Sequence, residues 1–422
     1  MTMLQQPALM SHWLGTLLAQ IGSYFTLIAL PWLVLSSQHN SAFSLALVMA
    51  CYGIPHSLLL LLGGALTDRY GPGRLILYSR AAFVLLMLLF ASALWLGLAS
   101  LPLICLFAFS VGCCSALGIP ASQSILPALV PTGQLLSANA SMMATGFVAQ
   151  AAGPVLIGAL IGWFASQFSA PSDSHPWQYL TLAFTADAAL VALSLCCAWH
   201  TSNYLPQHQT PASRAGLWRQ LQQSLAYCWQ HPNLRVILSY LLLLSLLLYG
   251  PLLTLIPLLA KIQLALDAQG MALLYGCQGV GTLTGALLVL HLKPTMPKLG
   301  LYILLLDLAA AISFCLLGYS QSAMLSGALL LLIGITAGFV MVAGTTWFQL
   351  HIPFHQIGTV LGLVMFAIHG LVPLASLYTG GLASIWPLST LTQICGSLVM
   401  LICITGLLTP TIRQMGKVHV TS

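Results

Sequence analysis

Four titratable side chains lie inside long apolar stretches of the sequence, namely His56, Asp187, Asp307 and His369. An ionisable group in hydrocarbon carries a large free-energy cost, so such groups are usually paired or placed along a functional path. Histidine changes its charge near neutral pH, and a carboxyl group in apolar surroundings can exchange a proton. These residue types therefore predict proton coupling or a protonation-sensitive gate.

A simpler interpretation of the same four residues stays open. Asp187 and Asp307 can be structural partners that accept hydrogen bonds from hydroxyl groups on neighbouring helices. His56 and His369 can be neutral, with each ring satisfied by a backbone carbonyl. Only the contacts of each side chain distinguish these alternatives.

The other residue types form no catalytic or metal-binding pattern. The chain has no glutamate, and its five aspartates are too dispersed for paired acid and base catalysis. Its eleven cysteines fall almost wholly in apolar stretches without CxxC spacing, so we interpret them as packing residues. We expect no enzymatic activity, no cofactor and no metal site.

The composition indicates which elements position these side chains. Among 422 residues, 59% are hydrophobic and 4% are charged, whereas about 25% of the residues in a soluble domain are charged. A helix needs roughly 20 mainly apolar residues to cross a bilayer with its backbone groups satisfied. We therefore predict an all-α polytopic membrane protein with twelve spans. Their limits are His12–Ser36, Ala42–Leu66, Leu75–Leu98, Leu101–Leu126, Ala138–Ser166, Trp177–His200, Leu234–Ile262, Gln269–Leu292, Leu299–Gly318, Ala323–Leu350, Ile357–Ser384 and Trp386–Thr409.

The basic residues predict the orientation, because short loops rich in lysine and arginine stay in the cytoplasm. With twelve spans, only Lys261 falls on the opposite side from the others. Both termini are then cytoplasmic, in the inner membrane of a bacterium, and we expect no removable signal peptide. The net charge of +6 therefore reports topology, and we expect no nucleic-acid partner. The residues on the cytoplasmic side are Arg69, Arg74, Arg80, Arg214, Arg219, Arg235, Lys293, Lys298, Arg413 and Lys417.

One long polar segment divides the chain into two halves of six spans. We predict an N-terminal bundle over residues 1–200, a cytoplasmic linker over residues 201–233, and a C-terminal bundle with a short tail over residues 234–422. Within the linker, apolar residues recur at helical spacing opposite arginine and glutamine, which predicts an amphipathic helix in the membrane interface. We interpret that helix as a tether between the halves.

The turn after the second span contains the most specific motif. Residues 64–74 read GALTDRYGPGR, which resembles the signature loop of the major facilitator superfamily. Glycine permits close helix approach and a tight turn, and an aspartate at a helix end can pair with basic groups or cap a neighbouring helix. The family usually has basic residues at positions 72 and 73, and Arg74 is the displaced substitute. The residues assigned to this motif are Gly64, Asp68, Arg69, Gly71 and Arg74. A simple topological charge cluster is the alternative.

The fifth span carries a second resemblance, to the glycine and proline motif of antiporters in this superfamily. Its glycines allow close helix packing, and its proline bends the helix. The resemblance implies export, although two glycines of the family motif are replaced at positions 149 and 157. The residues that carry it are Gly146, Gly153, Pro154 and Gly158.

Three further segments resemble the branch that contains macrolide efflux proteins and the enterobactin exporter. They are residues 120–131, 136–140 and 227–235. The resemblance implies two pseudo-symmetric six-helix bundles, each built from inverted three-helix repeats, that rock about a site near the bilayer midplane. It also implies that the second and eleventh helices pack between the halves, so that His56 and His369 could approach each other. Their repulsion when charged would separate the halves, and an anionic substrate would hold them together.

The first, fourth, seventh and tenth helices line the cavity in this family, which directs the choice of binding residues. For each polar side chain, a hydrogen bond between helices is the alternative to a ligand contact. The candidates for substrate binding are Gln20, Tyr24, Gln123, Asn139, Gln150, Tyr249, Gln278, Trp347 and Gln349.

These expectations describe a monomeric secondary transporter, surrounded by lipid, that exports a small amphiphilic molecule in exchange for protons. A siderophore or a drug-like compound fits that description. The frequent basic residue of the fourth helix has no counterpart between Leu101 and Leu126, which argues against the commonest drug and proton scheme. Import of a small metabolite or siderophore is the alternative, and a non-transporting sensor or scaffold is a further one.

Overall fold

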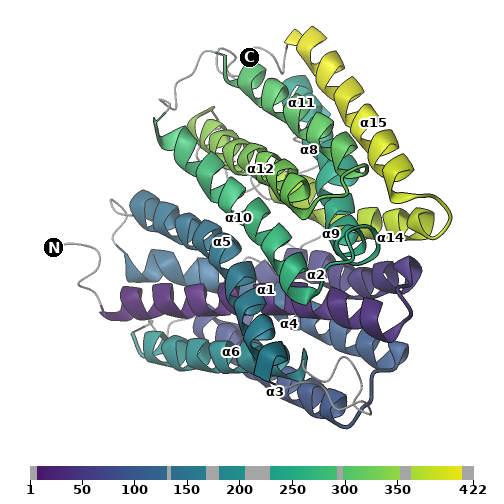
Figure 1. Cartoon of the computed structure of the whole chain (residues 1–422). Helices are drawn as coiled ribbons and strands as arrows, with labels where there is room; N and C mark the ends of the chain where they lie inside the picture. Colours follow the sequence, from purple (N-terminus) through teal and green to yellow (C-terminus); the bar gives the residue numbers. More distant parts are fainter. Residues whose placement is uncertain are drawn as a thin grey trace. The chain divides into compact units, whose positions relative to one another are not determined.

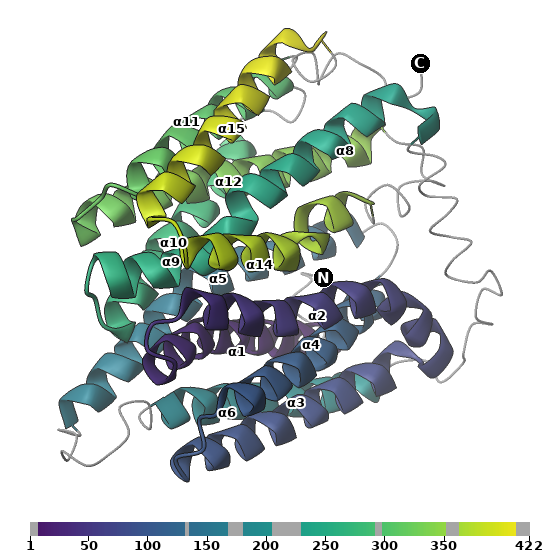
Figure 2. The same cartoon turned by 90° about the vertical axis from the view of Figure 1, so that its right-hand side faces the viewer.

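The computed structural model describes residues 7–130, 135–167, 180–204, 229–291, 298–351 and 363–410. The chain divides into two compact units, Met1–Arg214 and Ala215–Ser422 (Figures 1 and 2). Twelve helices are long and apolar enough to cross a membrane in the described part of the chain. The all-α prediction with twelve spans is therefore confirmed.

The N-terminal unit contains six long helices. Within it, α2 packs on α4, α6 packs on both α1 and α3, and α5 packs on α1. Several helix ends differ from the predictions; for example, α1 begins at Pro7 rather than His12, and α2 continues to Tyr70 rather than Leu66. The helices are α1 (Pro7–Ser37), α2 (Ala42–Tyr70), α3 (Pro72–Trp95), α4 (Leu101–Leu129), α5 (Leu135–Gln167) and α6 (Leu180–Ser202).

The C-terminal unit also provides six spans, but two of them contain π-helical segments. The seventh span, Pro232–Gln263, alternates α-helix and π-helix, and the eleventh span includes a π-helical turn. A π-helical turn widens the backbone hydrogen-bond ring, a feature frequent at functional sites. The elements are α8 (Pro232–Leu244), η3 (Ser245–Tyr249), α9 (Gly250–Leu258), η4 (Leu259–Gln263), α10 (Ala268–His291), α11 (Leu299–Leu317), α12 (Ala323–His351), η6 (Phe366–Gly370), α14 (Val372–Ala383) and α15 (Leu388–Leu408).

The turn between α2 and α3 shows how local chemistry ends one helix and starts the next. Gly71 has φ 82° and ψ 140°, and its N–H donates to the carbonyl of Thr67. A residue with a side chain would be strained at this φ. Pro72 then begins α3 at a position where its missing N–H costs no helical hydrogen bond.

In both units the second and fourth helices approach each other closely at glycines. In the N-terminal unit, a Cβ added at Gly112 of α4 would lie 2.2 Å from the carbonyl oxygen of Tyr52 on α2. The corresponding pair, α10 and α12, is in similarly close contact at four glycines. There an added Cβ would lie 1.9–2.2 Å from a carbonyl oxygen of the other helix, as expected for small residues spaced by four in membrane helices. These glycines are Gly281, Gly285, Gly334 and Gly338.

Three parts of the predicted organisation fall on residues that the structure does not describe. The predicted amphipathic helix lies in segment 205–228, outside the described residues. The predicted start of the eleventh span at Ile357 is also outside them, as are the side chains of Asp68 and Gln349 and the surroundings of Gly64.

Candidate functional site

The first site candidate is the contact between the polar face of α1 and α5. Gly153 of α5 lies against Tyr24, where an added Cβ would be 2.7 Å from the Cβ atom of the tyrosine. Seven residues earlier on α5, Gly146 faces Gln20, whose Oε1 atom would be 3.7 Å from an added Cβ. The Oε1 atom of Gln20 is buried without a hydrogen-bond partner in the described part of the chain. The structure therefore brings two predicted binding residues together with the glycine motif of the fifth span.

The other N-terminal candidates for substrate binding are more dispersed. Gln123 on α4 and Asn139 on α5 are exposed, and Gln150 on α5 is half-buried. Pro154 and Gly158 are buried within α5. The structure thus places Gln123 and Asn139 away from the packed contact between Tyr24 and Gly153.

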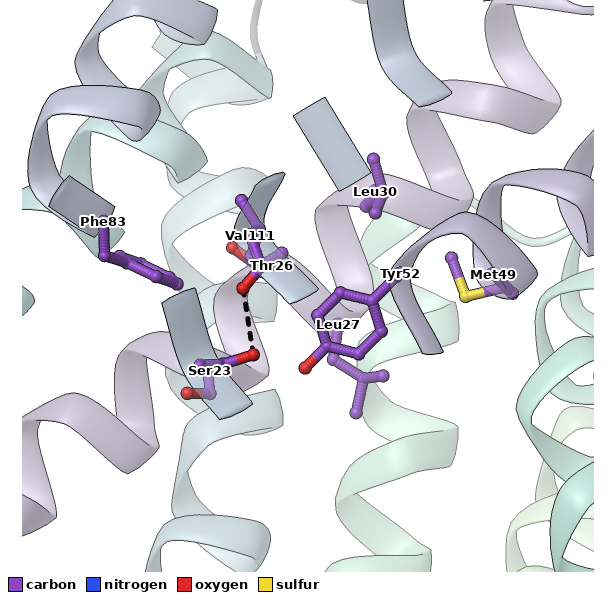
Figure 3. A pocket seen from close by; sticks show the side chains of 9 residues that line it. Ser23, Thr26, Leu27, Leu30, Met49, Tyr52, Phe83 and Val111 are labelled. Carbon is purple, nitrogen blue, oxygen red and sulfur yellow. Dashed lines mark hydrogen bonds between the residues drawn. The ribbon is translucent and has the colours of Figure 1, made fainter. Parts of the chain in front are cut away.

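A small pocket opens between the first four helices (Figure 3). The volume of the pocket is about 40 Å³, enough for about two or three waters. Its wall is mainly apolar, and Ser115 donates its hydroxyl to the carbonyl of Val111 at 2.9 Å. The lining residues are Ser23, Thr26, Leu27, Leu30, Met49, Tyr52, Phe83, Val111 and Ser115.

Asp187 lies behind one wall of this pocket. Its side chain on α6 is fully buried, and the hydroxyl of Thr26 on α1 donates to Oδ2 at 2.5 Å. The second oxygen, Oδ1, has no hydrogen-bond partner in the described part of the chain. Gly22 provides the space for this oxygen, because an added Cβ would lie 2.3 Å from it. Asp187 therefore has the hydroxyl partner that the structural interpretation required, for one of its two oxygens.

His56 lies near the same pocket. Its ring stacks on Tyr52, with 5.7 Å between the ring centroids. The histidine is half-buried on α2. The predicted gate residue His56 therefore contacts a side chain of the pocket wall. The second predicted gate residue, His369, lies in the C-terminal unit.

The C-terminal unit places a second group of predicted residues around its π-helical segments. Tyr249 is the last residue of η3, and its buried hydroxyl has no hydrogen-bond partner among the described residues. Next to it, an added Cβ at Gly250 would lie 2.3 Å from the Cβ of Ala375 on α14. His369 is exposed within η6.

Asp307 repeats the arrangement of Asp187 with a different donor. The carboxyl is fully buried on α11, and the phenol of Tyr240 on α8 donates to Oδ2 at 2.7 Å. The Tyr240 oxygen is also 3.8 Å from the sulfur of Cys403. As in the other unit, Oδ1 is without a hydrogen-bond partner in the described part of the chain.

Two further binding candidates belong to the glycine-rich pair of helices. Gln278 is half-buried on α10, and its backbone carbonyl faces Gly334. Trp347 on α12 is 3% exposed and meets Phe348 edge to face, with ring centroids 5.3 Å apart. The backbone of Gln278 thus takes part in the close packing of α10 and α12, and Trp347 is buried on α12.

The signature loop presents its described basic residues to the exterior. Arg69 is exposed, with its guanidinium carbon 5.4 Å from the ring centroid of Tyr70, and Arg74 is exposed at the start of α3. By contrast, Arg80 is buried, and its Nη1 donates to the carbonyl of Ser194 on α6 at 2.7 Å. Arg80 therefore connects two helices within the bundle.

The sequence did not identify the residues that bond the aspartates or line the pocket. Thr26, Tyr52, Ser115 and Tyr240 were absent from the predicted site. The available signal was chemical, because a carboxyl group in hydrocarbon requires a donor. The many hydroxyl residues in the spans made that donor impossible to choose without the helix contacts. Across the described residues, no three His, Cys, Asp or Glu side chains form a group that could hold a metal ion.

Comparison with known proteins matches most of the chain to one family. A model described as Major Facilitator Superfamily matches residues 13–376. An uncharacterized MFS-type transporter of Sinorhizobium fredii is 27% identical over 239 residues, which are 56% of this chain and 54% of that protein. That match thus spans about half the length of the relative. The staphyloferrin A transporter of Staphylococcus aureus is 24% identical over 397 residues, 91% of each chain.

Solved structures agree on the architecture. A POT family transporter in complex with a thioalcohol-conjugated peptide matches with a TM-score of 0.73, and the match covers 96% of each chain. The two sequences are 13% identical. At that identity the likeness shows the fold alone.

Proposed function

The chain belongs to the Major Facilitator Superfamily, and from this premise we propose that it is a proton-coupled exporter of a small amphiphilic molecule. It works by alternating access of two six-helix bundles to a site near the bilayer midplane. The observation that carries the proposal is the tight packing of α5 on the polar face of α1. Gly153 contacts Tyr24 there, in the span whose glycines and proline resemble the antiporter motif.

The substrate site proposed here uses side chains with polar atoms left available. Oε1 of Gln20 and the hydroxyl of Tyr249 are buried and have no hydrogen-bond partner among the described residues. A buried polar atom without a partner costs free energy, and a polar ligand group would recover it. Gln20 and Tyr249 are therefore the first residues we assign to substrate contact. The remaining proposed contacts are Tyr24, Gln123, Asn139, Gln150, Gln278, Trp347 and Gln349.

A siderophore is the substrate class we favour. The relative named as a staphyloferrin A transporter aligns with 91% of this chain, at 24% identity. A siderophore is also compatible with the polar but mainly uncharged residues proposed for the site. Drug-like amphiphiles form the second substrate class within the same function.

Protons are the coupling ion in this proposal. Export against a gradient needs an energy source, and the inward proton gradient of a bacterial inner membrane supplies it. We propose that His56 and His369 act as a protonation-sensitive gate. Replacing each with glutamine should abolish the pH dependence of transport, and full retention of that dependence would exclude the gate.

The test of export is accumulation of a panel of dyes, antibiotics and iron chelators in cells with and without the protein. The panel is repeated after the proton gradient is collapsed. We expect retention of one class to rise on deletion and on gradient collapse. Reduced uptake of a chelator on deletion would instead identify an importer and overturn the proposed direction.

Point variants connect that assay to the proposed site. Gln20→Ala and Tyr249→Phe should reduce efflux of the identified substrate while the protein remains in the membrane at its normal level. Ser92→Ala is a matched control, because Ser92 is exposed on α3 and its hydroxyl donates to the carbonyl of Leu88 within its own helix. Unchanged efflux in both site variants would remove these residues from the proposed site.

A further inference from the structure

The carboxyl group of Asp187 is a buried acid with little to stabilise its charge. It is fully buried in α6, and it accepts one hydrogen bond, from Thr26 to Oδ2. Oδ1 has no partner in the described part of the chain. Burying a carboxylate anion with a single neutral donor is costly. The neutral acid is therefore the favoured form in this arrangement, and the anion needs added hydration or a moved partner.

Among the described residues, the hydrogen-bond partner of Asp187 is the uncharged hydroxyl of Thr26. On α1 the contacts are Gly22 and Thr26, whose hydroxyl is also 3.8 Å from the sulfur of Met87 on α3. The titratable side chain of Tyr52 on α2 lines the same pocket as Thr26. Arg80 on α3 lies seven residues from Met87, about 10 Å along the helix.

Arg80 is engaged elsewhere, because its Nη1 donates to the backbone carbonyl of Ser194. The charge of Asp187 therefore depends on its one hydroxyl donor and on water.

The pocket between α1, α2, α3 and α4 supplies a place for that water. Thr26 both lines the pocket and donates to Asp187. Three other polar side chains, Ser23, Tyr52 and Ser115, share the pocket wall. The space of about 40 Å³ is sufficient for about two or three waters. Thr26 lines this pocket (Figure 3), and its hydroxyl also contacts the buried acid.

We propose that Asp187 is a proton-binding site of the N-terminal unit and that the Thr26 hydroxyl relays protons between it and this pocket. Proton binding at Asp187 would be the coupling step of the proposed proton-driven transport, so this inference rests on the proposed function. In the relay, a hydronium ion in the pocket gives a proton to Oγ1 of Thr26. The original hydroxyl proton of Thr26 passes along the existing hydrogen bond to Oδ2. The hydronium becomes water, the carboxylate becomes the neutral acid, and the hydroxyl is restored. Release follows the reverse path.

The experiment follows the carboxyl group directly and needs no substrate. Infrared difference spectra of the full chain in lipid nanodiscs, taken after a pH jump, report the C=O stretch of a protonated carboxyl group. The variants are Asp187→Asn, Thr26→Val and Thr26→Ser. Asp307→Asn is the matched control. Asp307 lies in the C-terminal unit, is equally buried, and accepts its hydrogen bond from the phenol of Tyr240 in that same unit.

We expect a pH-dependent carboxyl band that is lost in Asp187→Asn and retained in Asp307→Asn. Thr26→Val should slow the appearance of this band by roughly 100-fold, since a positioned proton-transfer group contributes a factor of about 100 or more. Thr26→Ser keeps the hydroxyl and should restore the rate. Size-exclusion profiles and circular dichroism of each variant check that the fold is intact.

Three results would overturn the proposal. The first is a titrating band that persists unchanged in Asp187→Asn, and the second is the absence of any titrating band in the wild type. The third is an unchanged rate in Thr26→Val, which would remove the relay. Because the spectra contain no substrate, these failures are distinct from failure of the export assay.

Discussion

The first and fifth spans of the N-terminal unit differ from the seventh and eleventh spans of the C-terminal unit, although they hold corresponding places in the two bundles. α1 and α5 are continuous α-helices, and they meet through apolar contact at Gly153 and Tyr24. The seventh and eleventh spans contain η3, η4 and η6. They are joined by hydrogen bonds from side chains to backbone carbonyls.

Those hydrogen bonds lie at the π-helical segments. Ser245 donates to the carbonyl of Ile368 at 2.5 Å, and the hydroxyl of Tyr378 donates to the carbonyl of Leu246 at 2.6 Å. A π-helical turn disturbs the regular backbone ladder, and a buried carbonyl needs a donor. The comparison teaches that steric fit holds the first and fifth spans together. The seventh and eleventh spans also depend on hydrogen bonds to the distorted backbone at the π-helical segments.

The largest expected effect comes from crowding the C-terminal pair. Gly250→Ala places a Cβ against Ala375, and we expect a loss of about 3 kcal/mol, the upper end for overpacking. The double variant Gly250→Ala with Ala375→Gly should recover much of this loss. Thermal unfolding of the purified protein in detergent measures both. If the double variant is no more stable than the single one, the contact does not limit packing there.

A smaller loss should follow when one polar bond is removed. Tyr378→Phe leaves the carbonyl of Leu246 without its side-chain donor, which costs about 1–3 kcal/mol for a buried group. Tyr275→Phe is the control, because its hydroxyl is 3.5 Å from the carbonyl of Leu253, a long and weak bond. Equal unfolding temperatures for the two variants would contradict the role given to polar bonds at η3.

The smallest effect is expected in the N-terminal pair. Gly153→Ala brings a Cβ to 2.7 Å from the Cβ of Tyr24, whereas Gly146→Ala brings one to 3.7 Å from Oε1 of Gln20. We expect a loss of about 1 kcal/mol for Gly153→Ala and almost none for Gly146→Ala. Unfolding temperatures of the two variants, measured side by side, test this difference. A larger loss at Gly146 would show that the steric account of this helix pair is wrong.

The turn at Gly71 illustrates what local chemistry makes predictable. A glycine followed by proline between two apolar segments predicts a tight turn, and the structure has φ 82° at Gly71. The interruption of the seventh span by η3 and η4 was not predicted, because Leu-rich sequence such as that around Ser245 is compatible with a regular α-helix. The distortion arises where Gly250 must approach Ala375 and where Ser245 bonds across to Ile368.

By itself, the sequence determined the number and type of the spans, and it identified Asp187 and Asp307 as unusual. Both conclusions depend on the cost of placing polar groups in hydrocarbon, which each residue carries wherever the helix packs. Only the tertiary structure decided that Thr26 bonds Asp187 beside a pocket and that Tyr240 bonds Asp307. Those partners lie 161 and 67 residues away in the chain, so helix packing had to bring them together.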